Sequence, residues 1–401
     1  MANKFRNPFN PIFSWYIKKR LHQIELFVKY PIEVQQETLL KLLKFARNTE
    51  FGKKYDFNSI KSVYDFKKNI PISKYEDIEP TIEKIKKGQQ NLLWPTEIKW
   101  LAKSSGTSTG KSKYIPVSKE AIENCHYKGG KDLLALYYNN NSNTKLFQGK
   151  HLIVGGSSNI NLMNKDVYFG DLSAIIVENL PWWCEWRRTP KKQITLLDDW
   201  EKKISAMAKT TVHEDVHILA GVPSWTLVLL NKIVENSNGK TIKEIWPNLE
   251  LYMHGGVSFE PYQEQFEKLL NFPNMNYVQT YNASEGFFGI QDEKSSESML
   301  LMLDYGVFFE FLPVNDLMQK HPKTLSLEEV KLNKNYALII TTNSGLWRYL
   351  IGDTIKFTSL NPFRFKVSGR TKNFINAFGE ELVIENAETA IAFACKETCS
   401  S

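Results

Sequence analysis

Apolar residues recur at helical spacing through the N-terminal quarter of the chain. From residue 31 to 46, the stretch PIEVQQETLLKLLKFA places them three and four positions apart, and its opening proline suits the first turn of a helix. Short helical stretches then follow, interrupted by Pro71 and Pro80 and ended by Gly88. We therefore predict a mainly helical N-terminal region with helix boundaries at both prolines.

The middle of the chain predicts buried strands. The runs HLIVGG, HILAGVPS, LELYMHGG and MNYVQTYNASEG are short and apolar, and glycine or small polar residues follow each of them. Helical stretches separate several of these runs, which is typical of an α/β sheet with ligand groups at the carboxyl ends of its strands. Residues 113–117 alternate like a strand, and residues 119–138 have a helical pattern.

A section richer in strands follows, with little helix between its members. VFFEFLPV, NYALIITT, LWRYLIGDTIKF and FRFKVSGRTK are close-set apolar runs with turns between them. This pattern predicts a barrel or an antiparallel sheet. The expected fold class is α/β.

Composition narrows the class of protein. A chain of 401 residues that is 42% hydrophobic is globular and enzyme-sized. The net charge of +7 is spread along the chain, so we expect no nucleic-acid partner. The four scattered cysteines predict neither a disulfide framework nor a structural zinc site, and hence a cytoplasmic setting. No apolar run is long enough to span a membrane, so we expect no membrane partner.

The most distinctive motif is SSGTSTGKSKYIP, residues 104–116. It is not a Walker A loop, because only three residues separate Gly106 from Gly110 and a strand follows instead of a helix. Backbone N–H groups, hydroxyl groups and the ammonium groups of Lys111 and Lys113 are nevertheless suited to bind a polyphosphate. Taken alone, the loop is equally compatible with a surface turn.

Four further motifs accompany this loop in a characteristic order: HGGVSFEPY (254–262), TYNASEG (280–286), WRYLIGD (347–353) and SGRTKNFINAFGEELVIENAE (368–388). Together they resemble the motifs of the adenylate-forming superfamily, and most of all its Gretchen Hagen 3 branch of acyl-acid amido synthetases. ARNTEFGKKYDF and DFKKNIPISKYEDIEP are similar to that branch in particular. Trp347 replaces the usual tyrosine, and two residues are inserted before Gly352.

The resemblance implies a domain organisation. Residues 1–370 would form a large adenylation domain with α/β sheets and a β-barrel-like subdomain, and residues 371–401 the hinge, at Lys372, and the beginning of a small C-terminal α+β domain. The chain ends at Ser401, before the family's distal catalytic lysine. We therefore expect a truncated bacterial member, or one that has lost its second half-reaction, with impaired turnover and a monomeric state.

The resemblance also assigns roles to individual residues, with ATP and Mg²⁺ as cofactors. Glu285 would bind Mg²⁺, Asp353 would accept both ribose hydroxyls, and Arg370 would contact ribose or phosphate. Ser284 would lie near the α-phosphate. The β- and γ-phosphates would contact Ser105, Gly106, Thr107, Ser108, Gly110 and Lys113, and the adenine would contact Gly255, Gly256, Val257 and Tyr281.

The implied reaction activates a carboxylic acid as acyl-AMP and transfers it to the amine of an amino acid. An acyl-CoA ligase and a catalytically impaired nucleotide-binding protein of the same fold remain alternatives. The apolar segments 169–174 and 221–225, with Val257, are the candidate acid pocket. Benzoate, auxin and fatty acids all remain open as the acid.

Two stretches are interpreted as structural. LPWWCEWRR, residues 180–188, is expected to pack in the core or at an interface, with Cys184 inert. His213 and His217 are four residues apart but run into a strand-like stretch, so they do not match a zinc-binding helix. We expect both histidines to be solvated or to cap an element.

Overall fold

The computed structural model describes residues 9–104, 112–141, 143–156, 160–164, 166–294, 296–371, 375–377 and 380–382. None of the described helices is both long enough and apolar enough to cross a membrane. The helices are α1 (Phe9–Lys29), α2 (Pro31–Ala46), α3 (Glu50–Lys54), α4 (Val63–Asn69), α5 (Tyr75–Lys86), α6 (Lys119–Ala121), α7 (Tyr127–Asn140), α8 (Leu172–Glu178), α9 (Trp182–Arg187), α10 (Lys192–Thr195), α11 (Trp200–Thr211), α12 (Pro223–Glu235), α13 (Ile242–Ile245) and α14 (Gln263–Leu269).

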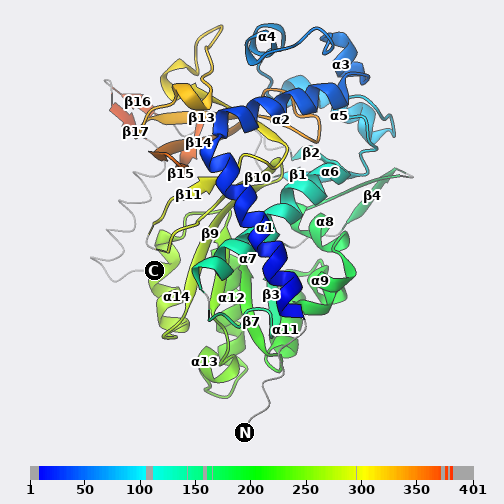
Figure 1. The fold of residues 1–401 in the computed structure, drawn as a ribbon. Coiled ribbons are helices and arrows are strands. Elements are labelled where there is room, and N and C mark those ends of the chain that lie inside the picture. Colours follow the sequence, from blue (N-terminus) through cyan, green and yellow to red (C-terminus); the bar gives the residue numbers. More distant parts are fainter. Residues whose placement is uncertain are drawn as a thin grey trace.

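The strands form one large sheet and two small ones (Figure 1). The large sheet has 11 strands in the order β12-β13-β14-β15-β11-β10-β9-β8-β7-β3-β6. The strands are β1 (Trp100–Ser104), β2 (Lys113–Val117), β3 (Lys150–Val154), β4 (Asn161–Asn164), β5 (Val167–Gly170), β6 (Arg188–Thr189), β7 (Val216–Gly221), β8 (Leu251–Gly255), β9 (Asn276–Ala283), β10 (Gly286–Ile290), β11 (Met299–Leu301), β12 (Val307–Pro313), β13 (Asn335–Thr342), β14 (Tyr349–Leu360), β15 (Phe363–Arg370), β16 (Ile375–Ala377) and β17 (Glu380–Leu382).

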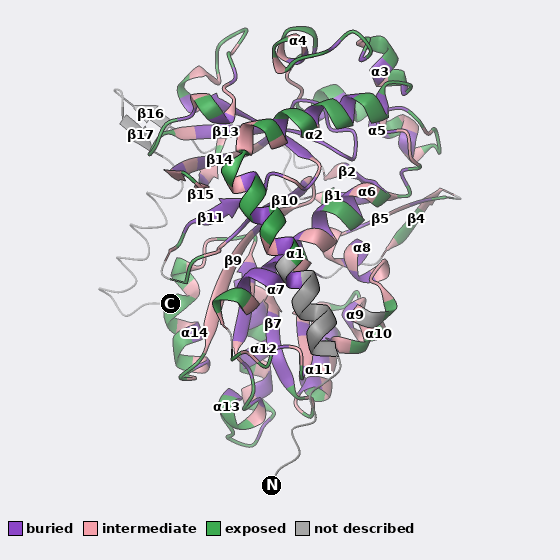
Figure 2. Ribbon diagram, in the orientation of Figure 1, coloured by how far each residue is buried: buried purple, intermediate pink, exposed green. Residues whose placement is uncertain are grey.

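Strands β3, β7, β8 and β9 are parallel neighbours, as the four apolar runs predict. Successive side chains of a strand point to opposite faces, so each run supplies two hydrophobic cores. Ile218 and Leu251 belong to the core on one face, whereas their sequence neighbours Leu219 and Tyr252 belong to the core on the other. Burial on both faces explains why these runs are continuously apolar instead of alternating (Figure 2).

Strands β12 to β15 pair antiparallel in sequence order, so the β-rich section extends the same sheet. The pairing passes through β11 and β10 to β9, where the parallel section begins. The carboxyl end of β9 therefore lies beside the antiparallel strands. Residues of the parallel strands and of the antiparallel strands therefore lie close together at the carboxyl end of β9.

The N-terminal region is helical, and α2 has the predicted bounds Pro31–Ala46. The predicted helix boundary at Pro80 is wrong, because α5 continues through that residue. Tyr75, Ile78, Ile82 and Ile85 are all buried along one side of α5. Burial of this apolar face outweighs the one backbone hydrogen bond that proline removes.

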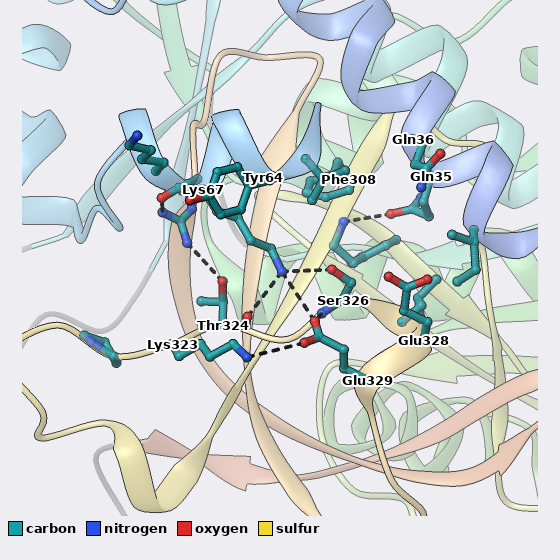
Figure 3. Close-up of a pocket in the computed structure, with 17 residues that line it drawn as sticks. Gln35, Gln36, Tyr64, Lys67, Phe308, Lys323, Thr324, Ser326, Glu328 and Glu329 are labelled. Atoms are coloured by element: carbon teal, nitrogen blue, oxygen red, sulfur yellow. Dashed lines mark hydrogen bonds and ion pairs between the residues drawn. The ribbon is translucent and has the colours of Figure 1, made fainter. Parts of the chain in front are cut away.

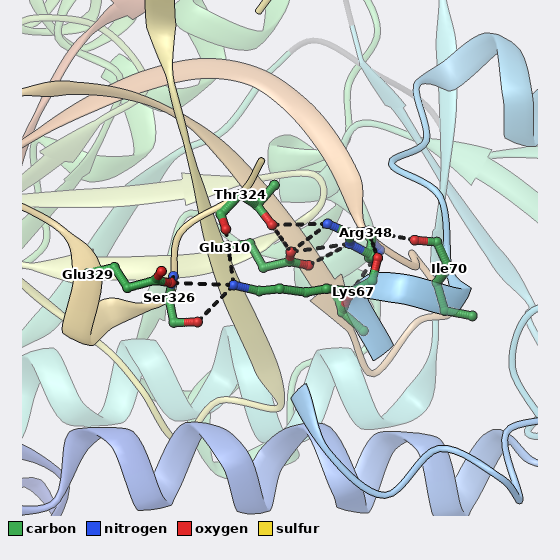
Figure 4. Close-up of polar contacts among 8 residues, drawn as sticks. Lys67, Ile70, Glu310, Thr324, Ser326, Glu329 and Arg348 are labelled. Atoms are coloured by element: carbon green, nitrogen blue, oxygen red, sulfur yellow. Dashed lines mark hydrogen bonds and ion pairs between the residues drawn. The ribbon is translucent and has the colours of Figure 1, made fainter. Parts of the chain in front are cut away.

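A buried ion pair connects the residue before β14 to strand β12. The Arg348 guanidinium donates to the Glu310 carboxylate, with 2.8 Å between Nη2 and Oε1, and Nη1 donates to the carbonyls of Lys67 and Ile70 (Figure 4). Thr324 Oγ1 donates to the same carboxylate. Arg348 has a φ of 45°, a region that non-glycine residues rarely occupy. These contacts hold the backbone in that conformation.

The outer side of this joint is a groove of about 660 Å³ between α2, α4 and the segment 322–329 (Figure 3). Lys67 Nζ donates to Ser326 Oγ at 2.8 Å and lies 3.8 Å from Glu329 Oε2. Lys323 also pairs with Glu329. Because these charged groups are already bonded to one another, we interpret the groove as part of a structural joint.

The Glu310→Gln substitution is expected to lower the free energy of unfolding by about 3–5 kcal/mol, because it leaves the Arg348 charge buried without its partner. Glu37→Gln is the matched control, since Glu37 and Lys41 form an ion pair that is 64% and 71% exposed. The control should change stability by less than about 1 kcal/mol. Urea unfolding measures both, and equal effects of the two substitutions would contradict the structural role of the pair.

Candidate active site

Glu285 lies in the turn that joins β9 to β10, at the junction between the parallel and antiparallel sections. The residue keeps some exposed surface, but its carboxyl group is shielded by its neighbours. Burial raises the pKa of Glu285 to about 7, and the charge of Asp353 adds to this rise, while Lys113 and Arg370 oppose it. Four charged residues from separate segments thus lie close enough to influence one another.

Asp353, on β14, is the centre of the polar contacts. Tyr281 donates from its hydroxyl to Asp353 Oδ2 at 2.6 Å, and Arg370 Nε lies 3.3 Å from Oδ1. Asp353 and Arg370 are direct cross-strand partners on β14 and β15. Burial and the Asp353 charge raise the pKa of Tyr281 well above its usual value, so its hydroxyl stays a donor. The structure therefore brings together Tyr281, Asp353 and Arg370, three of the residues predicted for the nucleotide.

Lys113, the first residue of β2, adds positive charge to this cluster. Its Nζ lies 5.6 Å from the centre of the Tyr75 ring, and the next residue, Tyr114, donates its backbone N–H to the Tyr75 hydroxyl at 3.0 Å. Ser73 connects the same segment to β14, because its N–H donates to the Arg348 carbonyl. The start of α5 thus lies between β2 and β14.

The predicted phosphate loop lies mostly outside the described residues. Lys113 is described, and it pairs with Ser104, so the two ends of the loop are neighbours in the β1–β2 hairpin. Ser284 is described and lies in the turn beside Glu285. Predictions for the loop residues remain untested; these are Ser105, Gly106, Thr107, Ser108 and Gly110.

Gly255 is the last residue of β8, next to β9, and Gly256 follows it. A Cβ atom at Gly255 would lie 2.4 Å from the Thr280 carbonyl oxygen, and Gly256 has a φ of 85°. The first position therefore requires glycine for close strand approach and the second favours it for its backbone angle. Val257, which follows this turn, is exposed. Thr280 precedes Tyr281, so the glycine pair adjoins the residues around Asp353.

The segments predicted to bind the acid also adjoin one another. A Cβ atom at Gly156 would lie 2.6 Å from Asp171 Oδ2 and 3.2 Å from the Trp225 ring, and one at Gly256 would lie 3.4 Å from Val222. Lys203, which the sequence motifs do not single out, is buried, and its ammonium group donates to the Gly155 and Gly156 carbonyls. Burial lowers its pKa to about 8. A lysine on a helix carries no sequence signal for such burial.

One structural expectation is wrong, and a second is correct only in part or stays open. His217 is neither solvated nor a cap: it is buried on β7, and its Nε2 lies 3.1 Å from Asp215 Oδ2. Trp182 and Trp186 are 82% and 68% exposed on α9, which excludes core packing for these two side chains and leaves packing at an interface as a prediction. Cys184 behaves as expected, because burial raises its pKa to about 11. The described residues contain no cluster of three metal-ligating side chains.

The arrangement is similar to that of solved adenylate-forming enzymes. The chain superposes on the AtGH3.15 acyl acid amido synthetase in complex with 2,4-DB with a TM-score of 0.77 and 21% identity, covering 98% of this chain and 76% of that one. A 2-hydroxyisobutyryl-CoA ligase, solved with 2-HIB-AMP and CoA, superposes with a TM-score of 0.56 and 12% identity, covering 88% of this chain and 78% of that one. These likenesses establish the adenylate-forming fold.

Sequence comparison then gives the family. Residues 20–275 match the GH3 family N-terminal domain, and residues 300–370 match the GH3 family central domain. The chain therefore belongs to the Gretchen Hagen 3 (GH3) family.

Curated plant relatives align over most of the chain. The Arabidopsis thaliana indole-3-acetic acid-amido synthetase GH3.4 is 25% identical, covering 86% of this chain and 67% of the relative. The Nicotiana attenuata jasmonoyl--L-amino acid synthetase JAR4 is 24% identical, covering 84% and 68%. The chain thus spans about two thirds of the length of these relatives.

Gly255→Ala is expected to destabilise the protein by about 1–3 kcal/mol, because the added methyl group meets a backbone oxygen and forces β8 away from β9. Gly130→Ala in α7 is the control, since a Cβ atom there has nothing within 4 Å. This control should gain about 0.5–1 kcal/mol from helix propensity. Chemical denaturation distinguishes the two, and an undiminished stability of Gly255→Ala would contradict the close strand approach.

Proposed function

We propose that this chain is an ATP-dependent acyl-acid amido synthetase. A carboxylate oxygen of the acid attacks the α-phosphorus of ATP, the bond to the β-phosphate oxygen breaks, and pyrophosphate leaves. The amine of an amino acid then attacks the acyl carbon, AMP leaves with the bonding electron pair, and the amine gives up a proton as the amide forms. Membership of the GH3 family and the activities printed for GH3.4 and JAR4 support this reaction.

The observation that carries the proposal is the cluster of Tyr281, Asp353 and Arg370 next to Glu285. Asp353 presents two carboxylate oxygens, and each has a further lone pair beyond its contact with Tyr281 or Arg370. Two neighbouring ribose hydroxyls can donate to this pair of oxygens. The glycine turn after β8 adjoins Thr280, the residue before Tyr281, and a flat base would lie against its backbone. This geometry supports adenosine as the ligand of the subsite.

Glu285 suits the role of a magnesium ligand. Its carboxyl group is shielded, and its raised pKa indicates that the neighbouring cations do not fully compensate its charge. Mg²⁺ commonly binds one or two carboxylates together with substrate phosphates and water, so a single glutamate is sufficient. When bound, Mg²⁺ neutralises charge on the phosphate oxygens. Glu285 would hold it beside the α-phosphate.

The chain's own residues mainly bind and align the reactants, because attack by a carboxylate needs no general base. Asp353 and Tyr281 fix the nucleoside, and the positive charge of Lys113 attracts the polyphosphate. Arg370 balances the two acidic groups and can reach the ribose or a phosphate from its 59% exposed position. Ser284 would orient the α-phosphate from the turn next to Glu285.

The acid would bind where residues 169–174 and 221–225 adjoin Val257, and this neighbourhood supports an apolar acid. Residues 1–370 would act as the adenylation domain and residues 371–401 as the hinge and the start of a C-terminal domain. The cytoplasmic setting, the monomeric state, the impaired turnover and the bacterial, truncated origin stay predictions. Small carboxylic acids and amino acids are the proposed partners.

Acid-dependent exchange of radioactive pyrophosphate into ATP tests the first half-reaction. Asp353→Ala and Glu285→Ala are each expected to reduce the exchange rate by about 10²-fold or more, because each removes a group that positions the reacting phosphate. Glu297→Gln, which changes an exposed carboxylate in the connection between β10 and β11, should exchange at the wild-type rate. Undiminished exchange in both site variants would contradict the assigned site.

The acceptor distinguishes the proposed function from its alternatives. With an acid that supports exchange, we expect amino acids to yield an amide and coenzyme A to yield no thioester, as mass spectrometry of the products can determine. Thioester formation alone would identify an acyl-CoA ligase, whose fold is similar. Binding of ATP without exchange for any acid would instead identify a nucleotide-binding protein.

A further inference from the structure

Lys203 lies on α11 and is completely buried. Lysine is rarely buried in this way, because removing its ammonium group from water is unfavourable. The two other lysines of the same helix, Lys202 and Lys209, are exposed. The helix thus turns one of its three charges into the protein, and this charge needs a physical explanation.

The buried ammonium group binds the turn that follows β3. It donates to the Gly155 carbonyl at 3.0 Å and also to the carbonyl of the next residue, Gly156. An ammonium group carries three rotatable donors on a compact charge, so it can bond both carbonyls at once. Because two consecutive carbonyls point at one donor group, Lys203 fixes the conformation of this turn.

The other side of the turn contacts the start of α8 and α12. The Gly156 N–H donates to Ser173 Oγ at 3.2 Å, and a Cβ atom at Gly155 would lie 3.3 Å from the same oxygen. A Cβ atom at Gly156 would approach Asp171 Oδ2 and the Trp225 ring, as described above. The turn therefore lies between the buried ammonium group and these side chains, with no room for an added methyl group.

This turn is at the edge of the sheet where ligands bind in α/β proteins. Val154 and Gly221, the last residues of the parallel strands β3 and β7, pair with each other. Ligands of such sheets bind outside the carboxyl ends of the strands. The turn after β3 touches both segments proposed to hold the acid, residues 169–174 and 221–225. Lys203 thus supports both of them from behind.

Stability alone does not explain a lysine at this position. Burial lowers the pKa of Lys203 to about 8, and the negative charge of Asp171 opposes this shift. The lowered pKa means that the surroundings disfavour the charged form. An apolar side chain of similar size would avoid the cost of burying the charge. What such a side chain could not do is bind the two carbonyls of the turn.

We propose that Lys203 is a positioning residue for the carboxylic acid substrate: by holding the turn after β3, it sets the distance between the two segments that enclose the acid. This inference rests on the proposed function, because it takes an apolar carboxylic acid as the ligand of that place. Lys203 itself does not touch the acid. It acts through the Gly155–Gly156 backbone on Ser173 and Trp225.

The Lys203→Met substitution tests this, because it keeps the length and the apolar stem of the side chain and removes the ammonium group. Acid-dependent exchange of pyrophosphate into ATP is measured with benzoate, indole-3-acetate and octanoate as probe acids. The KM for the acid is expected to rise by about tenfold or more, since small displacements of the groups that hold a reactant have effects of this size. The KM for ATP should be unchanged.

Met207→Ala is the matched control, since Met207 is also completely buried on α11, one turn after Lys203. It should lower the thermal unfolding temperature and leave the KM for the acid unchanged. If Lys203→Met behaves like this control, its role is only structural and the inference is wrong. A rise of the KM for ATP by the same factor as the KM for the acid would also contradict it.

Ser173→Ala is a second test that does not depend on the folding of Lys203→Met. It removes the oxygen that accepts from the Gly156 N–H and so loosens the turn from its other side. The same pattern is expected, a higher KM for the acid with an unchanged KM for ATP. Wild-type KM values for both substrates in Ser173→Ala would overturn the inference.

The wild-type protein separates this inference from the proposed function. Absence of exchange by the wild type with every probe acid would overturn the proposed function and the inference together. Exchange by the wild type and by Lys203→Met with the same KM for the acid would overturn the inference alone.

Discussion

The attachment of β14 to its neighbours is the constraint on which the site depends. Arg348 occupies a strained backbone conformation, and its guanidinium joins β12 to the C-terminal end of α4. Breaking such a buried pair leaves one charge without a partner. Arrangements of the chain that separate Arg348 from Glu310 are therefore strongly disfavoured. Tyr349 follows immediately, and Asp353 lies four residues further along the same strand. The joint therefore fixes the strand that carries Asp353.

The second constraint is electrostatic. The fold places Glu285 and Asp353 near each other in a partly shielded region, where burial raises the pKa of Glu285 and repulsion from the Asp353 charge raises it further. Lys113 and Arg370 reduce this repulsion from two other strands. Such a cluster has little value for stability, since shielded carboxylates are costly. It is suited to a ligand that brings both hydroxyl donors and a divalent cation, as Mg-ATP does.

Much of the fold could be predicted from the sequence because local rules and tertiary packing agree. The runs that end at Gly221 and Gly255 are apolar on both faces. Such short continuous apolar runs are typical of strands in a sheet that is covered on both sides. Rules based on single residues failed where packing prevailed. Pro80 lies within α5 because four apolar side chains anchor that helix, and His217 is buried as part of the covered strand β7, where its ring contacts Asp215.

The residues of the site could be predicted from sequence motifs, but their contacts could not. Tyr281, Asp353, Arg370 and Glu285 lie in ordered motifs, so resemblance identified them before their proximity was known. Lys203 lies outside these motifs, and no pattern distinguishes a buried lysine of a helix from an exposed one. That property, like the contact of Lys113 with Tyr75, arises from segments that are far apart in the sequence. Only the three-dimensional structure reveals it.

A crystal structure of the chain with bound AMP tests the central claim most directly. The account predicts that both ribose hydroxyls donate to the carboxylate of Asp353, with the adenine beside Tyr281 and the glycine turn after β8, and with the phosphate directed toward Glu285. A nucleotide whose ribose lies away from Asp353, or whose phosphate points away from Glu285, would contradict it.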